Sequence, residues 1–261
     1  MLRFAAAALV AASAVLSAAP AFAQDSNDYR VRVGLGVQIA PEYLGSDDHE
    51  FGPAFDFSLA RGGDPFDFEA PDDSFGISLL DFGGFEAGPA LNFERARKDK
   101  DVGAPVGKVP ATVEAGAFVQ YAIGSNFRLR SELRKGIGGH NGLVGNVGAD
   151  LFWRDGDKFL VSAGPRLLFS NSRYQREYFG VTPEAALATG LPVYRPGGGI
   201  HAIGLAASTY AQISGPFGMF GFASYDRLVG DAADSPIVRT FGSRDQLSAG
   251  VGLTYTFNIA R

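Results

Sequence analysis

Apolar and polar residues alternate along most of the chain, in segments about ten residues long. The clearest segment is 247–257, where every second residue from Leu247 to Phe257 is apolar and the residues between are Ser, Gly or Thr. Segments 127–134 and 159–170 follow the same pattern, with Leu160 and Leu168 as exceptions. A period of two is typical of β-strands, whose successive side chains point to opposite faces.

The alternation predicts strands along nearly the whole chain. They are expected near 29–40, 50–60, 65–70, 74–81, 84–95, 111–122, 127–137, 143–153, 158–170, 200–213, 217–228 and 245–257. The patterns at 65–70 and 74–81 are the weakest, and without them the count is ten. We therefore predict an all-β fold, an antiparallel transmembrane β-barrel of about 12 strands, with 10 as the alternative.

The connections between these strands alternate in length, which supports the barrel. One set lies at 61–64, 82–83, 124–126, 154–157 and 214–216, and every member is short. The other set lies at 41–49, 71–73, 96–110, 138–142, 171–199 and 229–244, and most of its members are long. Short periplasmic turns that alternate with long extracellular loops are typical of outer-membrane barrels.

The first 23 residues have the features of a secretory signal peptide. Arg3 precedes the apolar run 4–18, and Ala21-Phe22-Ala23 is a small-x-small cleavage site. The apolar run is short for a transmembrane anchor, and no later run of about 18 apolar residues follows. We expect export through the inner membrane, with residues 24–261 forming a barrel in the outer membrane and contacting its lipid.

Composition narrows the possible chemistry. The chain has no Cys, three His and a formal net charge of −5. This excludes disulfide scaffolds, Cys-ligated metals and Cys nucleophiles, and it argues against a nucleic-acid partner. We predict no cofactor and no metal site. His140 has only diffuse Ser and acidic neighbours in the sequence, so we interpret it as a polar loop residue and predict no enzymatic activity.

The charged positions of the strands should face the lumen, because a charge at mid-membrane costs about 2–4 kcal/mol on the lipid face. The same parity places Arg30, Arg32, Asp56, Glu86 and Glu94 inside. The candidate lumen cluster comprises Glu114, Arg128, Arg130, Glu132, Arg134, Asp150 and Arg166. It could attract anions in a pore, bind an anionic ligand, or form ion pairs that fill the lumen. We favour the ion pairs, because the flanking strands carry the carboxylates.

Two outer loops carry the remaining candidates. In loop 171–199, Thr182 can cap a short helix that begins at Pro183 and ends before Gly190, forming either a plug or a packed lid. In loop 229–244, two carboxylates could bind calcium, but a turn capped by Asp234 or Ser235 is favoured. Asp47-Asp48 and Asp72-Asp73 are interpreted as solvated loop charges. The candidate loop sites are Tyr178, Phe179, Asp231 and Asp234.

Ten stretches of the chain carry a family resemblance, and the segment 227–238 is the most specific. They are 34–36 (GLG), 41–46 (PEYLGS), 88–89 (GP) before Arg95, 113–116 (VEAG), 140–142 (HNG), 164–166 (GPR), 178–182 (YFGVT), 190–194 (GLPVY), 227–238 (RLVGDAADSPIV) and 255–257 (YTF). In their order and number they resemble the MipA/OmpV family, the MltA-interacting proteins of Gram-negative outer membranes. The chain departs from the family pattern at two places: Asn141 stands where the family favours Gly, and four residues follow Phe257. Outer-membrane barrels usually end on an aromatic residue.

The resemblance implies a non-enzymatic scaffold in murein metabolism, whose partners would be a lytic transglycosylase and a murein synthase. Other members are discussed as adhesins, osmotic-stress proteins or antibiotic-associated proteins. Two alternatives therefore stay open. One is a small diffusion channel, and the other is a surface-binding, adhesin-like protein that uses loops 171–199 and 229–244.

Overall fold

The computed structural model describes residues 28–260, so the predicted signal peptide lies outside the described part. Five short helices occur in it: α1 (Asp99–Val102), α2 (Ser172–Phe179), α3 (Pro183–Thr189), α4 (Gly230–Asp234) and α5 (Pro236–Phe241). Two strands are very short, β3 (Phe75–Gly76) and β4 (Leu80–Phe82). The long strands are β1 (Tyr29–Pro41), β2 (His49–Arg61), β5 (Phe85–Glu94), β6 (Thr112–Ile123), β7 (Phe127–Gly138), β8 (Leu143–Asp155), β9 (Phe159–Ser170), β10 (Gly199–Ser214), β11 (Phe217–Leu228) and β12 (Asp245–Ile259).

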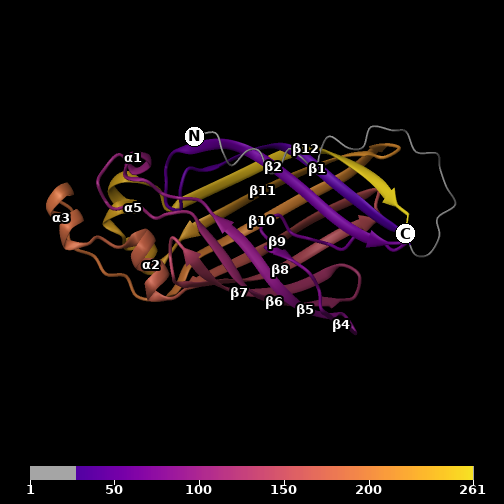
Figure 1. Cartoon of the computed structure of the whole chain (residues 1–261), viewed down its shortest axis with the longest axis horizontal. Coiled ribbons are helices and arrows are strands. Elements are labelled where there is room, and N and C mark those ends of the chain that lie inside the picture. Colours follow the sequence, from indigo (N-terminus) through magenta and orange to yellow (C-terminus); the bar gives the residue numbers. More distant parts are fainter. Residues whose placement is uncertain (1–27, 261) are drawn as a thin grey trace.

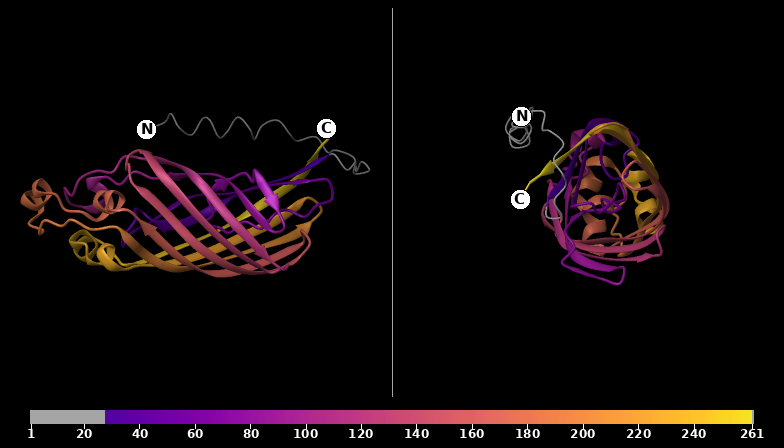
Figure 2. Two further views of the ribbon diagram at one scale, coloured as in Figure 1. Left: turned by 90° about the horizontal axis from the view of Figure 1, so that it is seen from below. Right: turned by 90° about the vertical axis from the view of Figure 1, so that its right-hand side faces the viewer.

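The strands form one antiparallel sheet that curls around a central lumen (Figure 2). Neighbours in the chain are neighbours in the sheet from β5 to β12, and β1 then pairs with β12. Tyr29 lies opposite Ile259, so Asn258 and Ile259 continue the last strand beyond Phe257. The predicted class and the count of twelve strands are confirmed for the described residues.

The expectation for the two weakest strands was wrong. Residues 65–70 form no strand, and 74–81 contribute only β3 and part of β4, which pair with β5. The sheet is also not closed by hydrogen bonds, because β2 stands at one end of the strand order and β3 at the other. Within residues 28–260, no strand pairs with the outer edge of β2. Pro53, which lacks an N–H, is tolerated on such an edge strand.

The two faces of the wall follow the sequence alternation. Outward residues are apolar and exposed, such as Leu35 (64%), Phe55 (67%) and Leu253 (65%). This apolar surface suits contact with lipid, where only apolar side chains are tolerated at low cost. None of the helices in the described residues is long and apolar enough to cross a membrane.

Helices cover one end of the barrel, opposite the end where Tyr29 and Ile259 pair (Figure 1). We call this cover the lid, formed by α1, α2, α4, α5 and their connecting loops. The lid core contains the buried residues Val109, Val144, Tyr174, Tyr178, Phe179, Ala202, Leu228, Ala232, Ala233 and Val238. The short turns lie at the opposite end, which the loop-length rule assigns to the periplasm.

The predicted helix in loop 171–199 is confirmed as α3. The hydroxyl of Thr182 accepts a hydrogen bond from the Ala185 amide at 3.2 Å, and Pro183 opens the helix. Gly190 ends it with a φ of 77°, a left-handed conformation that favours glycine. The sequence analysis missed α2, whose cap is Asn171. It also missed α1, α4 and α5, since loop 229–244 was predicted as a turn. Ser235 does cap the local backbone as expected, because its hydroxyl accepts a hydrogen bond from the Ile237 amide.

Candidate functional site: a filled lumen

Alternate positions on β7 point into the lumen and carry four charged side chains. Arg128, Arg130 and Arg134 are 3%, 8% and 7% exposed, and Glu132 between them is 1% exposed. Glu132 accepts a hydrogen bond from Arg130 at 2.8 Å with one oxygen and pairs with Arg134 through the other. Glu132 therefore offsets only part of the positive charge that the three arginines bring into the lumen on this strand.

Asp150 of β8 links this row to β9. One of its oxygens lies 2.7 Å from Nη2 of Arg128, and the other lies 2.7 Å from Nη2 of Arg166. Asp150 is 1% exposed and Arg166 is 6% exposed. A single carboxylate shared by two buried guanidinium groups leaves an excess of positive charge at this level of the barrel.

The missing carboxylates come from a segment that crosses the lumen. We call residues 62–74, between β2 and β3, the lumen strap. Asp72 accepts two hydrogen bonds from Arg166, at 2.6 and 2.9 Å. Asp73 accepts two from Arg128, at 2.6 and 3.2 Å. The interpretation of Asp72-Asp73 as solvated loop charges was wrong in part. Both carboxylates pair with arginines of the barrel wall, and the Asp73 side chain is only 12% exposed, whereas that of Asp72 is 34% exposed.

Other contacts hold the strap along its length. The Phe68 ring stacks on Phe152 of β8, with ring centroids 4.4 Å apart, and Arg128 lies 4.6 Å from the Phe68 centroid. The Phe66 amide donates to Asp157 at 2.9 Å, and the Ser74 amide donates to Glu132 at 3.2 Å. Aromatic packing and buried ion pairs together fix the strap across the lumen.

A second buried cluster lies closer to the lid. Glu114 of β6 accepts hydrogen bonds from Arg134 at 2.9 Å and from Asn92 at 3.0 Å. Its other oxygen lies 2.9 Å from Nε2 of His140. His140 is completely buried and packs edge-on against Tyr174. The interpretation of His140 as a polar surface residue was wrong, because this side chain turns inward and meets Glu114.

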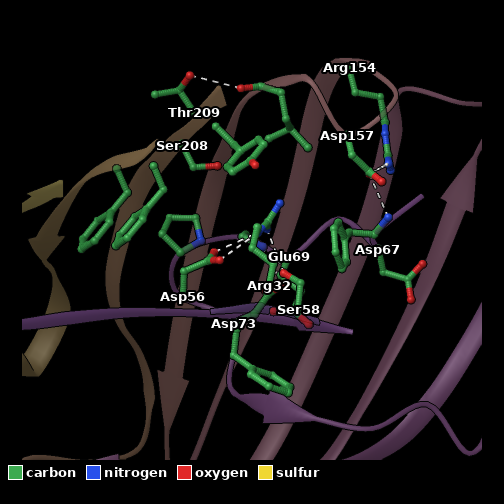
Figure 3. A pocket seen from close by; sticks show the side chains of 18 of the residues that line it. Arg32, Asp56, Ser58, Asp67, Glu69, Asp73, Arg154, Asp157, Ser208 and Thr209 are labelled. Carbon is green, nitrogen blue, oxygen red and sulfur yellow. Dashed lines mark hydrogen bonds and ion pairs between the residues drawn. The ribbon is translucent and has the colours of Figure 1, made fainter. Parts of the chain in front are cut away.

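Two cavities remain in the lumen, on either side of the strap anchors. One of about 200 Å³ lies under the lid and is lined by Glu94, Glu114, Tyr174, His201 and Asp226, among others. The other, of about 210 Å³, lies towards the turn end. It is shown in Figure 3, where Arg32, Asp56 and Glu69 lie near its centre. The layer of Asp72, Asp73, Arg128 and Arg166 separates the two.

The lid contains the candidate loop residues. Tyr178 and Phe179 are 1% and 0% exposed and belong to the lid core, and burial raises the pKa of the Tyr178 hydroxyl. Asp231 accepts a hydrogen bond from the Gly197 amide at 2.6 Å, and Asp234 lies 2.6 Å from Arg239. These contacts give each of the four a place within the lid.

Arg97, between β5 and α1, holds this part of the lid to helix α2, and the sequence analysis did not single it out. Its guanidinium donates to the carbonyl oxygens of Tyr178, Glu177 and Gly107, the last two at 3.1 Å. The first two carbonyls lie at the C-terminal end of α2, where a cation is favourable. Arg97 is 2% exposed, and this burial lowers its pKa.

A charge count could not have identified the strap. The seven residues of the predicted lumen cluster contain four arginines and three carboxylates, but the same parity also placed Arg30, Arg32, Asp56, Glu86 and Glu94 inside. Together they make six arginines and six carboxylates, so the predicted interior was already balanced. His140 and Arg97 carried no signal either, because nothing in a loop sequence indicates which way a side chain turns.

The curled sheet, its apolar outer face and its charged interior define an outer-membrane β-barrel. The chain belongs to the MltA-interacting protein MipA family, whose family model matches residues 33–257. This family and the barrel fold together locate the protein in the outer membrane. No curated protein matches the sequence.

Solved structures with similar folds are distant. An outer membrane channel from Pseudomonas putida F1 has 8% identity and a TM-score of 0.41, over 92% of this chain and 100% of the other. A mutant of the monoaromatic hydrocarbon channel TodX has 9% identity and a TM-score of 0.36, over 91% of each chain. OprG from Pseudomonas aeruginosa has 10% identity and a TM-score of 0.26, over 90% and 97%.

Proposed function

We propose that the protein is a non-enzymatic, non-conducting barrel that acts as a scaffold in murein metabolism, with a lytic transglycosylase as its partner. The lumen strap is the observation that supports the absence of conduction. It crosses the lumen, where Asp72 pairs with Arg166 of β9 and Asp73 pairs with Arg128 of β7. The family's description as MltA-interacting supports the partner. A murein synthase would be a second partner of the same scaffold.

The filled lumen supports a scaffold over a pore for a physical reason. Ion conduction needs a continuous water-filled path with sites that bind ions weakly. Here the arginines that could line such a path already pair with Asp72, Asp73, Asp150 and Glu132. The lid adds a second barrier at the other end of the barrel.

The proposal assigns no reaction to the buried polar groups. In the described residues, one side-chain hydroxyl lies within hydrogen-bond distance of an imidazole: Ser170 Oγ is 3.1 Å from His201 Nδ1. Both are buried, at 5% and 1% exposure, beneath the lid. Within residues 28–260 no carboxylate is hydrogen-bonded to His201, so the orienting third group of a hydrolase triad is not supplied.

The scaffold is tested by site-specific photo-crosslinking in cells. A photoreactive residue at Lys158, in the turn between β8 and β9, faces the periplasmic end. The matched control is Leu187 of α3, which is 90% exposed at the opposite end. The proposal expects a crosslinked lytic transglycosylase from position 158 and none from position 187. The scaffold would be contradicted if the folded protein gave no crosslinked lytic transglycosylase from a photoreactive residue at any of the short turns.

The diffusion channel is kept as the second candidate, because cavities of about 210 and 200 Å³ remain on either side of the strap. Single-channel recording of the folded wild-type protein in a planar bilayer separates the two proposals. If the protein is a scaffold with a filled lumen, the wild type should carry no steady current. A steady current from wild type would instead mean that the strap leaves a path open.

A further inference from the structure

Lys135 of β7 is a cation on the lipid-facing side of the barrel wall. It belongs to the outward set of this strand, between Leu133 and Ile137, which are 50% and 60% exposed. Because β7 runs towards the lid, Ile137 lies nearer to the lid end than Lys135 does, so the lysine lies within the apolar band. Its ammonium must extend towards the lipid headgroups, since a charge among hydrocarbon chains is costly.

This lysine has no carboxylate partner in the protein. The cations at the lid end of two other strands are paired: Arg95, directly after β5, pairs with Glu50, and Arg227 of β11 pairs with Asp245. Within residues 28–260, by contrast, the Lys135 side chain makes no ion pair and no hydrogen bond. A cation that the protein leaves unpaired at the membrane surface is free to meet an anion from the membrane.

A groove of about 450 Å³ lies beside Lys135 on the same outer face. Leu133, Leu143 and Phe169 form its apolar part. Gly145 lies opposite both Leu133 and Phe169, and a Cβ there would lie 2.7 Å from Cζ of the Phe169 ring, so only a glycine leaves room for this ring. The rim of the groove towards the lid is formed by residues 170–172 and 198–199.

The strand register places Lys135 next to this rim. Lys135 lies opposite Leu143, and the Asn171 amide donates to the Leu143 carbonyl oxygen at 2.9 Å. Lys135 and Asn171 are therefore two strand spacings apart, about 10 Å. Arg173, in the first turn of α2, is exposed and also makes no ion pair in the described part of the chain, and neither does Glu177 one turn further on. Two unpaired cations thus flank the rim of a groove whose lining residues are uncharged.

We infer that this groove binds an anionic lipid of the surrounding leaflet, whose headgroup phosphate lies between Lys135 and Arg173. One acyl chain of the lipid packs against Leu133, Leu143 and Phe169. The two cations select a headgroup with a net negative charge, whereas a zwitterionic headgroup carries its own ammonium and gains less from them. This site is independent of the scaffold role, and neither proposal requires the other.

The test uses tryptophan fluorescence and lipids with dibrominated acyl chains, whose bromine atoms quench tryptophan at short range. The reporter variant is Trp153→Phe/Phe169→Trp, in the full mature chain refolded into vesicles of unbrominated phosphatidylcholine. Brominated phosphatidic acid and brominated phosphatidylcholine are compared at equal fractions of the lipid. We expect phosphatidic acid to bind beside position 169 about threefold more tightly, as for an exposed ion pair. Leu143→Trp is the alternative reporter if Phe169→Trp does not fold.

A matched reporter separates this site from a general attraction of the barrel for anionic lipid. Trp153→Phe/Leu247→Trp places the tryptophan on β12 at the same end of the barrel, where Leu247 is 54% exposed. The neighbouring cation Arg227 already pairs with Asp245, so the two brominated lipids should quench this reporter equally.

Substitutions of the two cations test the phosphate position. In the Phe169→Trp reporter, Lys135→Gln/Arg173→Gln should reduce the preference for phosphatidic acid from about threefold to about one. Lys135→Arg keeps the charge and should retain the preference. Both positions are exposed, so the barrel should fold in each variant.

Three results would overturn the inference. Equal quenching of the position-169 reporter by both lipids would show that the groove does not select an anionic headgroup. The same preference at position 247 would show a general attraction with no site. A preference that persists in the folded Lys135/Arg173 double variant would remove the assigned phosphate position.

Discussion

Neutralising the strap anchors should open the lumen. The perturbation is Asp72→Asn/Asp73→Asn, which removes two negative charges and hardly changes side-chain volume. Arg128 and Arg166 would each keep one carboxylate, Asp150, at 2.7 Å. The barrel wall should therefore still fold, while the strap loses its charged attachment to the opposite wall.

The size of the effect follows from four hydrogen bonds. Arg166 donates to Asp72 at 2.6 and 2.9 Å, and Arg128 donates to Asp73 at 2.6 and 3.2 Å. Hydrogen bonds to charged groups contribute about 1.5–3 kcal/mol, against roughly 1 kcal/mol for neutral pairs. A loss of about 1 kcal/mol per bond gives about 4 kcal/mol in total. The equilibrium between docked and released strap should then shift about 10³-fold.

Single-channel recording in a planar bilayer measures the result. We expect no steady current from wild type and frequent opening events from the double variant. The matched control is Asp47→Asn/Asp48→Asn, which makes the same chemical change at two exposed loop residues. The reasoning would be refuted by a folded Asp72/Asp73 variant that stays as closed as wild type, or by openings in the control.

Three further changes probe the buried cluster, the lid and the β1–β12 seam. Glu114→Ala should lower the free energy of unfolding by about 3 kcal/mol, because Arg134 and His140 lose their shared buried partner; the urea midpoint measures this. Arg97→Met should expose the lid to proteinase K and speed its cleavage about tenfold, because the carbonyls at the end of α2 lose their donor. Gly36→Ala should reduce the yield of refolded barrel, since a Cβ at this position would lie 2.0 Å from the Val251 carbonyl oxygen. A gel that separates the folded barrel from heat-denatured protein measures this yield.

Each of these variants has a control with the same substitution at a site that lacks the contact. Glu177→Ala is the control for Glu114→Ala, and Arg173→Met is the control for Arg97→Met, because Glu177 and Arg173 are exposed on α2. Gly63→Ala is the control for Gly36→Ala, because it adds a methyl group where no atom lies within 4 Å. All three should behave like wild type. An effect in a control as large as that in its partner would mean that the named contact is not the cause.

The sequence alone determined the wall of this barrel. Alternation over ten residues, as in segment 247–257, defines a strand locally, and the cost of a charge in lipid decides which face turns inward. Loop lengths then placed the lid and the turns at opposite ends. Thr182, Pro183 and Gly190 also predicted α3, because capping and left-handed turns depend on neighbouring residues only.

The interior of the barrel was decided by the tertiary structure. Residues 65–70 alternate as a strand does, yet Phe66 and Phe68 pack inside the lumen beneath arginine side chains. A period of two shows that a segment has two different faces, but it does not show what either face will meet. Buried arginines on β7 and β9 required carboxylates, and Asp72 and Asp73, distant in sequence, supplied them. Such pairing depends on which groups the fold brings together, since an ion pair is strong only where both charges leave water at the same place.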